Sequence, residues 1–371
     1  MVYLDYAATT PMRSEALEAY VEAAKKYFGN ESSLHNIGYE AEELLKKCRH
    51  TFAHLLKVEA EGIYFTSSGS EANVLTLLSI LKGNEDKKHI MTTKAEHASL
   101  YHLFEQLKEE GYEVSYLPLN KDGIVTVDIL KTFVREDTVL FASSHVNPEV
   151  GGIQPIEAIG RFLQKENILF HVDCVQSFGE CDIPVQVIDS LAISAHKIYG
   201  PKGCGLAYIR PGVSWQPVYD GTTHERGFKP GTVDLPAITA FTIAAQLACQ
   251  EMVLKQGHYL ALRSYLEKRL VGLERVRIIE CGSQLPQIVG LTLAGMEGQY
   301  TLLSCNEKGI AISTGTACSV SMQDPSRTML ALGYDEDVAR QFVRISFGKE
   351  TSQEDLDLFV AALEQLVYEY V

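Results

Sequence analysis

The chain has 371 residues, about twice the size of a typical single domain, so two lobes are expected. Apolar residues make up 46% of the sequence and charged residues 22%, which excludes a disordered chain or a fibrous repeat. The 33 basic residues against 48 acidic ones give a net charge of −15, which argues against nucleic acid as a direct partner.

The sequence gives no sign of export or membrane insertion. The amino terminus reaches Asp5 before an apolar segment could form, so no secretory signal is expected. No uncharged apolar run approaches the roughly 20 residues that a membrane-spanning helix needs. The eight cysteines are scattered, without C-x-x-C spacing, which indicates neither a metal site nor a disulfide framework. We expect a cytoplasmic protein with reduced thiols.

Between about residues 60 and 210, short β-branched runs alternate with helical patterns, which predicts a mostly parallel, seven-stranded sheet between helices. Helices are expected from Ser70 and over Ile156–Lys165, where apolar residues recur at helical spacing. Right-handed crossovers should place the helices on both faces of the sheet. The expected strands are Gly62–Thr66, His89–Thr93, Glu113–Leu117, Thr138–His145, Ile168–Asp173, Leu191–Ser194 and Gly205–Ile209.

The pattern of residues changes after this α/β region. A turn-rich stretch, Asp220–Pro236, is followed by long helical patterns to about Val271. The remainder mixes strands with helices and predicts a second, smaller α+β lobe. Its expected strands are Gln287–Leu293, Ile310–Ser313 and Phe342–Ser346, and its last helix is Gln353–Tyr370.

The most informative residue is Lys197, which follows the predicted strand that ends at Ser194. Ligands of α/β sheets collect at the carboxyl ends of strands. A desolvated lysine there can form a Schiff base with an aldehyde, the linkage that holds pyridoxal phosphate. A lone lysine is more often an ordinary surface residue.

Asp173 ends another predicted strand, in the sequence His171-Val-Asp-Cys-Val-Gln176. Pyridoxal phosphate needs a carboxylate on its pyridinium nitrogen, so Asp173 and Lys197 could bracket a flat ring at the edge of the sheet. The alternative for Asp173 is a helix cap or a turn residue.

The turn Ser67-Ser-Gly-Ser-Glu71 lies between a predicted strand and a predicted helix. Backbone N–H groups and the positive end of the helix dipole form an anion site at such a junction, which suits a phosphate. Ordinary helix capping is the alternative. His97, in Glu96-His-Ala-Ser99, follows a third strand and could stack on a ring and carry a proton, or be purely structural.

These four motifs, in this order and spacing, resemble the pyridoxal-phosphate cysteine desulfurases of the NifS/IscS kind, within the class V aminotransferase group. The resemblance runs nearly end to end. It also includes the segments Tyr3–Pro11, Gly29–His35, His224–Gly227 and Arg344–Gly348.

The resemblance implies a site for each motif. Lys197 would form the Schiff base, Asp173 would pair with the pyridine nitrogen, and His97 would stack on the ring. The other implied cofactor ligands are Gln176 at the ring hydroxyl, Gly69, Ser70, Ser194 and His196 at the phosphate, Asn147, and Thr232 reaching the phosphate of a neighbouring subunit in a homodimer. Arg344, aided by Asn147, would bind the substrate carboxylate. No metal is implied.

The resemblance also implies the reaction, because Cys318 stands in a Gly/Ser/Thr-rich segment that the aminotransferases do not need. Its thiolate would take the sulfur of L-cysteine as a persulfide, release L-alanine and pass the sulfur to an acceptor protein, such as an iron–sulfur scaffold or a thiolation enzyme. The implied domains are a large cofactor-binding domain over 15–255 and a small domain over 1–14 and 256–371, which carries Cys318 and Arg344.

Three positions depart from the family pattern: Pro148 replaces a second asparagine, Lys229 a common arginine, and Glu31 a common proline. Proline has neither a side-chain donor nor an N–H, so substrate affinity could be weaker. Selenocysteine lyase, class V aminotransferase and a non-enzymatic acidic scaffold remain as alternative functions.

Overall fold

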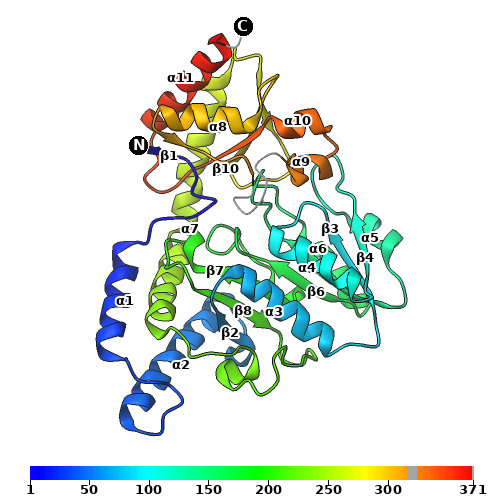
Figure 1. The fold of residues 1–371 in the computed structure, drawn as a ribbon, viewed down its shortest axis with the longest axis vertical. Coiled ribbons are helices and arrows are strands. Elements are labelled where there is room, and N and C mark those ends of the chain that lie inside the picture. The colour runs from blue at the N-terminus through cyan, green and yellow to red at the C-terminus, as the bar shows by residue number, and fades with distance from the viewer. Residues whose placement is uncertain (316–323, 370–371) are drawn as a thin grey trace.

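The computed structural model describes residues 1–315 and 324–369 (Figure 1). The helices of these residues are α1 (Ser14–Lys26), α2 (Asn36–Leu56), α3 (Gly69–Lys82), α4 (Ala98–Glu109), α5 (Val127–Phe133), α6 (Ile156–Lys165), α7 (Leu235–Leu270), α8 (Gly298–Glu307), α9 (Arg327–Ala331), α10 (Glu336–Arg340) and α11 (Gln353–Glu369). The strands are β1 (Val2–Tyr3), β2 (Ile63–Thr66), β3 (His89–Thr93), β4 (Glu113–Leu117), β5 (Thr138–Ser144), β6 (Leu169–Asp173), β7 (Ser190–Ser194), β8 (Gly205–Ile209), β9 (Val276–Ile279), β10 (Ile288–Leu293), β11 (Ile310–Ala311) and β12 (Phe342–Ser346).

The larger part of the molecule is built on a seven-stranded sheet with the strand order β2-β8-β7-β6-β5-β3-β4. Strand β8 runs antiparallel to both of its neighbours, and the remaining pairs are parallel. The central strands are buried along their whole length, as strands covered on both faces must be. The predicted α/β class and the mostly parallel sheet are confirmed.

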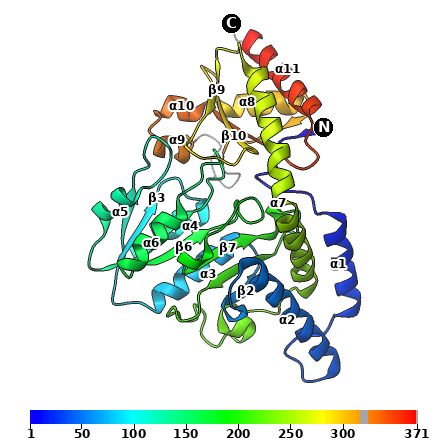
Figure 2. The same cartoon turned by 180° about the vertical axis from the view of Figure 1, so that it is seen from behind.

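Helices cover both faces of this sheet, as the crossover rule requires (Figures 1 and 2). One face packs on α2, α6 and α7, where Phe52 and Phe241 lie in the largest hydrophobic core. The other face packs on α3 and α4, where Leu77 and Phe104 lie in a second cluster. The carboxyl ends of β5, β6 and β7 meet in register at one edge of the sheet. Ser144 pairs with Asp173 there, and Asp173 pairs with Ala192.

The second lobe contains a three-stranded antiparallel sheet, β12-β10-β9, and the parallel pair β1-β11. Its own core includes Leu266, Val343 and Phe359. The predicted α+β character of this lobe is confirmed, and the sequence missed β1 and β9. Strand β1 has only two residues, and Ile279 alone is buried in β9, so neither strand carries an alternating pattern.

Helix α7 passes through both cores (Figure 2). Its Phe241 and Ala245 belong to the first core, whereas Tyr259 and Leu266 belong to the second. Among the described residues, α7 is the one helix long and apolar enough to cross a membrane, but these side chains pack inside the protein as in a core helix. The domain boundaries expected from the sequence stay a prediction.

Candidate active site

A cavity of about 160 Å³ lies at the carboxyl ends of the central strands, between the sheet and the second lobe. Nine of the residues expected from the sequence line it: Gly69, Ser70, His97, Asp173, Gln176, Ser194, His196, Lys197 and Arg344. Gly69 and Arg344, the two that are farthest apart in the sequence, are separated by 275 positions. The tertiary fold therefore assembles one site from residues that the sequence leaves scattered.

Lys197 enters the cavity from a short 3-10 turn, Ala195–Lys197, that follows directly on β7. Its Nζ donates hydrogen bonds to the carbonyl oxygens of Ala7, at 2.6 Å, and Ala8, at 2.8 Å. The amino-terminal segment is thereby held against the catalytic edge of the sheet. Thr10 fixes the same contact, because its N–H donates to the carbonyl of His196 at 2.9 Å.

Asp173 is the last residue of β6 and is 6% exposed. Its Oδ1 accepts the N–H of Val175 at 2.9 Å, and its Oδ2 accepts from Nδ2 of Asn73 at 2.8 Å. These bonds hold the carboxylate at the wall of the cavity. A carboxylate fixed in this way suits the positively charged nitrogen of a flat heteroaromatic ring.

The amino terminus of α3 forms an anion cradle with β7. Ser68 caps the helix by accepting the N–H of Glu71 at 3.0 Å. A Cβ on Gly69 would lie 2.6 Å from Cγ2 of Val175 and 3.1 Å from Cβ of Ser194, so only glycine leaves this space open. The buried Oγ of Ser194 has no hydrogen-bond partner among the described residues. An unpartnered hydroxyl beside a helix amino terminus fits the phosphate of pyridoxal phosphate.

His97 is the N-cap of α4, and its Nδ1 accepts the N–H of Ser99 at 3.2 Å. Burial lowers the pKa of His97, and the nearby Asp173 opposes that shift. The preceding residue, Glu96, is fully buried, and burial raises the pKa of its carboxyl. Glu96 accepts hydrogen bonds from Thr93 and from both the N–H and the hydroxyl of Ser144, so it fixes the turn that carries His97.

Two further predicted ligands line the cavity from the same edge. Gln176 donates from Nε2 to the carbonyl of Ala7 at 2.9 Å, the oxygen that also accepts from Lys197. His196 has Nδ1 at 3.2 Å from the hydroxyl of Thr9. Burial, together with the charge of Lys197, lowers the pKa of His196 to about 4, so the ring is neutral at pH 7.

Arg344 lies on β12 of the second lobe, and its side chain is 2% exposed. One terminal nitrogen donates to the carbonyl of Pro148 at 2.9 Å, and the other donates to Asp5 at 2.7 Å. The buried Nε has no partner among the described residues. Arg344 lines the cavity, and its planar guanidinium suits a carboxylate.

Two predicted site residues, Asn147 and Thr232, do not line the cavity. The amide of Asn147 bonds the carbonyl of Ala95 and the hydroxyl of Thr328, and its Oδ1 accepts two backbone N–H groups. This geometry does not support the expected contact of Asn147 with cofactor or substrate, because every polar group of the side chain is occupied. Thr232 is exposed on the loop before α7. Cys318 lies outside the described residues.

The structure also adds residues that the sequence analysis did not assign to the site. Asn73, Ala7 and Ala8 line the cavity. Asn73 lies one helical turn after Gly69, and this spacing is the signal that could have placed it at the same edge. The carbonyl groups of Ala7 and Ala8 have no sequence signal, since any residue supplies a carbonyl.

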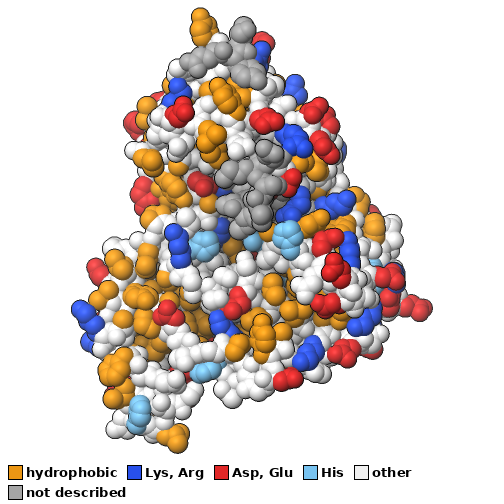
Figure 3. Space-filling view, viewed as in Figure 1, with side chains coloured by type: hydrophobic (Ala, Val, Ile, Leu, Met, Phe, Trp, Pro, Cys, Tyr) orange, Lys and Arg blue, Asp and Glu red, His pale blue; other side chains and the backbone are white. Residues whose placement is uncertain are grey.

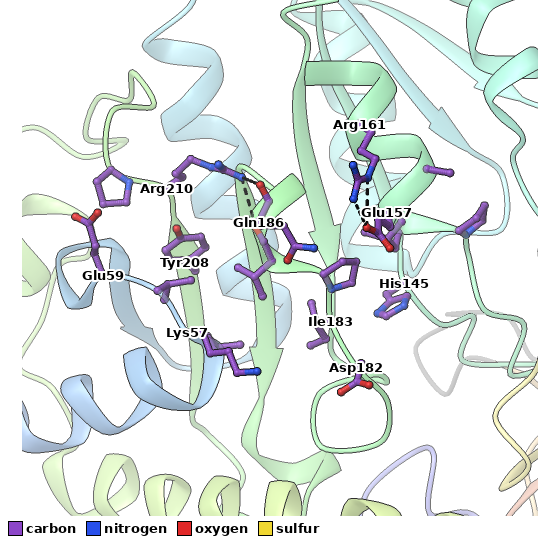
Figure 4. Close-up of a pocket in the computed structure, with 18 residues that line it drawn as sticks. Lys57, Glu59, His145, Glu157, Arg161, Asp182, Ile183, Gln186, Tyr208 and Arg210 are labelled. Atoms are coloured by element: carbon purple, nitrogen blue, oxygen red, sulfur yellow. Dashed lines mark hydrogen bonds and ion pairs between the residues drawn. The ribbon is translucent and has the colours of Figure 1, made fainter. Parts of the chain in front are cut away.

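A larger hollow of about 1330 Å³ lies elsewhere on the molecule (Figure 4). It is lined by the end of α2, the start of α6 and the segment after β8. Two of its charged groups pair with their own neighbours: Arg161 with Glu157 at 2.6 Å, and Arg210 with the carbonyl of Gln186 at 3.0 Å.

No group of three or more potential metal ligands occurs within residues 1–315 and 324–369. The site combines a lysine, a carboxylate and an anion cradle, a set that suits an aldehyde cofactor with a flat ring and a phosphate. The model of the aminotransferase class-V family matches residues 2–359, and the chain belongs to this family.

Named relatives are similar over nearly their whole length. The NifS protein of Bacillus subtilis (strain 168) is 44% identical over 96% of this chain and 92% of its own. The cysteine desulfurase IscS of Methanosarcina thermophila is 37% identical over 99% of this chain and 92% of its own. The solved structure of a NifS-like protein superposes with a TM-score of 0.92 at 32% identity and covers 99% of both chains. The resemblance read from the sequence is confirmed.

Proposed function

We propose that the protein is a pyridoxal-phosphate-dependent cysteine desulfurase. It converts L-cysteine into L-alanine, collects the sulfur as a persulfide on Cys318, and passes it to an acceptor protein for iron–sulfur cluster synthesis or thiolation. The observation that carries the proposal is the convergence of Lys197, Asp173 and Arg344 on one cavity beside an anion cradle. The similarity to cysteine desulfurases over the whole chain supports the same conclusion.

Each side chain has a defined task in this proposal. Lys197 would hold the cofactor through its aldehyde, Asp173 would pair with its ring nitrogen, and the α3 terminus with Ser194 would hold its phosphate. The bound cofactor supplies an electron sink for the bonds to Cα of the amino acid.

The amino acid is oriented by Arg344, whose planar fork suits a carboxylate. The amine of Lys197 would act as the base at the Cα proton. His97 lines the same cavity, where it would stack on the cofactor ring and carry a proton. The Cys318 thiolate would attack the sulfur of the substrate, so that an S–S bond forms while the Cβ–S bond breaks. The electron pair of the broken bond stays with the carbon skeleton, which takes up a proton and leaves as alanine.

The attachment of the cofactor is tested by borohydride reduction followed by peptide mass spectrometry. We expect pyridoxyl mass on Lys197, and none anywhere in the Lys197→Ala variant. Pyridoxyl found on another lysine, or no incorporation after incubation with pyridoxal phosphate, contradicts the proposal and favours a non-enzymatic scaffold.

The role of Cys318 is tested by the Cys318→Ala variant. It should keep the absorbance of the bound cofactor and lose sulfide release from L-cysteine. Cys181→Ala is the matched control, because burial raises the pKa of Cys181 to about 12 and leaves it a protonated thiol. Sulfide release that survives in Cys318→Ala, or transamination in its place, contradicts the persulfide mechanism. Parallel assays with L-selenocysteine separate a lyase of that substrate from a desulfurase.

We further propose that the protein is a homodimer in which Thr232 reaches the phosphate of the neighbouring subunit. Large apolar side chains are exposed on α1, α2 and the loop between them, where Figure 3 shows orange side chains at the lower left. The apolar side chains are Leu17, Val21, Phe28, Leu34 and Tyr39. Glu31 in this loop bonds Nδ1 of His224 at 3.1 Å, which joins the apolar surface to the loop of Thr232. Contiguous exposed apolar surface is typical of a subunit interface.

Mixed dimers test the sharing of sites between subunits. Lys197→Ala and Thr232→Ala subunits are each expected to be impaired when alone. A hybrid of the two keeps one complete site if Thr232 acts across the interface, so mixing should restore up to half of the wild-type activity per dimer. No recovery in a purified hybrid would place Thr232 at its own subunit's site. A cytoplasmic location is part of the same proposal, since the seven described cysteines are free thiols.

A further inference from the structure

Asn73 connects two side chains of the cavity, Asp173 and His97. It bonds Asp173 directly and reaches His97 through Ser99. It lies in the first turns of α3 and is 1% exposed. Its Nδ2 is 2.8 Å from Oδ2 of Asp173 and 3.1 Å from Oγ of Ser99. Its Oδ1 is 3.0 Å from Nε2 of His171. All the donors and the acceptor of the amide are therefore used.

The direction of each bond follows from what the partners can donate. The carboxylate of Asp173 only accepts, so the NH₂ group of Asn73 faces it and Oδ1 faces His171. Nε2 of His171 must then carry the proton. Nδ1 of His171 accepts from the hydroxyl of Ser190 at 2.9 Å, on the strand position that pairs with His171.

His171 is fixed in this state by its surroundings. It is fully buried, and burial lowers its pKa to about 3, so it stays neutral over the physiological range. It stands two residues before Asp173 on β6, on the same face of the strand. The strand therefore presents both partners of Asn73 on one face: His171, which donates to it, and Asp173, which accepts from it.

The second proton of the Asn73 amide is donated to Ser99, which contacts His97. Nδ1 of His97 accepts the backbone N–H of Ser99, so the Oγ of Ser99, which accepts from Asn73, donates its own proton to that nitrogen over 2.9 Å. The N–H of Ser99 donates to the same nitrogen at 3.2 Å. Protonation of Nδ1 would break both bonds, so the proton of the neutral ring resides on Nε2.

We propose that Asn73 is a positioning residue that joins the two arms of the site. Through Nδ2 it orients the carboxylate of Asp173, and through Ser99 it holds His97 as the Nε2–H tautomer. His97 therefore meets the reacting groups as a hydrogen-bond donor and not as an acceptor. This inference rests on the proposed function, which gives Asp173 and His97 their tasks.

The tautomers can be read by NMR of protein labelled with ¹⁵N-histidine and stripped of cofactor, which does not depend on activity. His97 and His171 are assigned from His97→Gln and His171→Gln proteins. We expect both rings to be neutral with the proton on Nε2. In Asn73→Ala we expect the His97 signals to move toward a mixture of tautomers, and the affinity for pyridoxal phosphate to fall roughly 10- to 100-fold, as expected for a lost bond to a charged group.

Thr76→Val is the matched control. Thr76 lies on the same helix and is equally buried, and its hydroxyl has no hydrogen-bond partner among the described residues. This variant should leave both tautomers and the cofactor affinity unchanged. If Asn73→Ala and Thr76→Val have the same free energy of unfolding, the effects of Asn73→Ala on tautomer and affinity come from its lost hydrogen bonds. If Asn73→Ala is misfolded, the isosteric Asn73→Asp replaces it in the experiment.

An unchanged His97 tautomer in a folded Asn73 variant, or an Nδ1 proton in the wild type, overturns the inference. Failure of the proposed function is a separate result, since wild-type protein would then bind no pyridoxal phosphate while its histidine tautomers could still be read.

Discussion

Arg344, which lines the cavity, forms an ion pair with the partly buried Asp5, with 2.7 Å between a terminal guanidinium nitrogen and Oδ1. Arg344 comes from β12, and Asp5 lies in the amino-terminal segment that also binds Lys197 through Ala7 and Ala8. The pair fixes the plane of the guanidinium. The amino-terminal segment thus orients both the lysine and the arginine of the site.

Replacement of Arg344 by lysine should raise KM for L-cysteine by about 10- to 100-fold, because an ammonium keeps the charge but lacks the planar fork. Steady-state kinetics of sulfide release measures the change. The control is Arg263→Lys, since Arg263 is similarly buried but bonds Glu267 and Glu280 away from the cavity. An equal rise of KM in both variants would contradict a carboxylate-binding role of Arg344.

Pro148 lines the cavity, at a position where the family resemblance leads us to expect asparagine. Pro148→Asn adds a side-chain donor beside Arg344, whose guanidinium bonds the Pro148 carbonyl. We expect KM for L-cysteine to fall by about 3- to 10-fold at an unchanged kcat, as expected for one added hydrogen bond to a carboxylate. Pro155→Asn, which removes a proline outside the cavity, should leave KM unchanged. A higher KM in Pro148→Asn would show that proline is required here.

A methyl group at Gly69 should weaken cofactor binding, because its Cβ would lie 2.6 Å from Cγ2 of Val175 in the phosphate cradle. We expect the Kd for pyridoxal phosphate to rise about 10-fold or more in Gly69→Ala, from a strain of about 1–3 kcal/mol. Fluorescence titration of the cofactor-free protein measures it. The double variant Gly69→Ala/Val175→Ala removes the clash and should recover most of the affinity. No recovery would mean that the methyl group acts on the phosphate directly.

His145 should make stability depend on pH below neutrality. Burial lowers its pKa to about 4, from an ordinary value of 6.5. Between pH 4 and 6.5 the unfolded chain therefore binds a proton that the folded chain does not, so the free energy of unfolding falls as the pH is lowered through this range. From pH 6.5 to pH 5 the loss is about 2 kcal/mol for this one residue.

Urea unfolding of the cofactor-free protein at several pH values tests this prediction. His145→Gln should show a shallower decrease of stability between pH 6.5 and pH 5 than the wild type. The exposed His258 gives the control His258→Gln, which should keep the wild-type slope. Parallel curves for wild type and His145→Gln would contradict a neutral, buried His145.

The sequence by itself determined the class of the fold and most of the chemistry. The alternation of β-branched runs with helical patterns predicted the sheet, because strands buried on both faces must be apolar along their length. Lys197, Asp173, Ser194 and the Ser67–Glu71 turn were recognisable for the same reason: each lies at the end of a strand or just after it, and a parallel sheet brings strand ends to one edge.

Only the tertiary structure decided which groups complete the site. The carbonyls of Ala7 and Ala8, the pairing of Arg344 with Asp5 and the bonds of Asn73 join segments far apart in the chain. Packing also selected Ala95 and Thr328 as the partners of the Asn147 amide. Residue type and spacing limit what a side chain can do, but its partners are selected by packing, which no local pattern records.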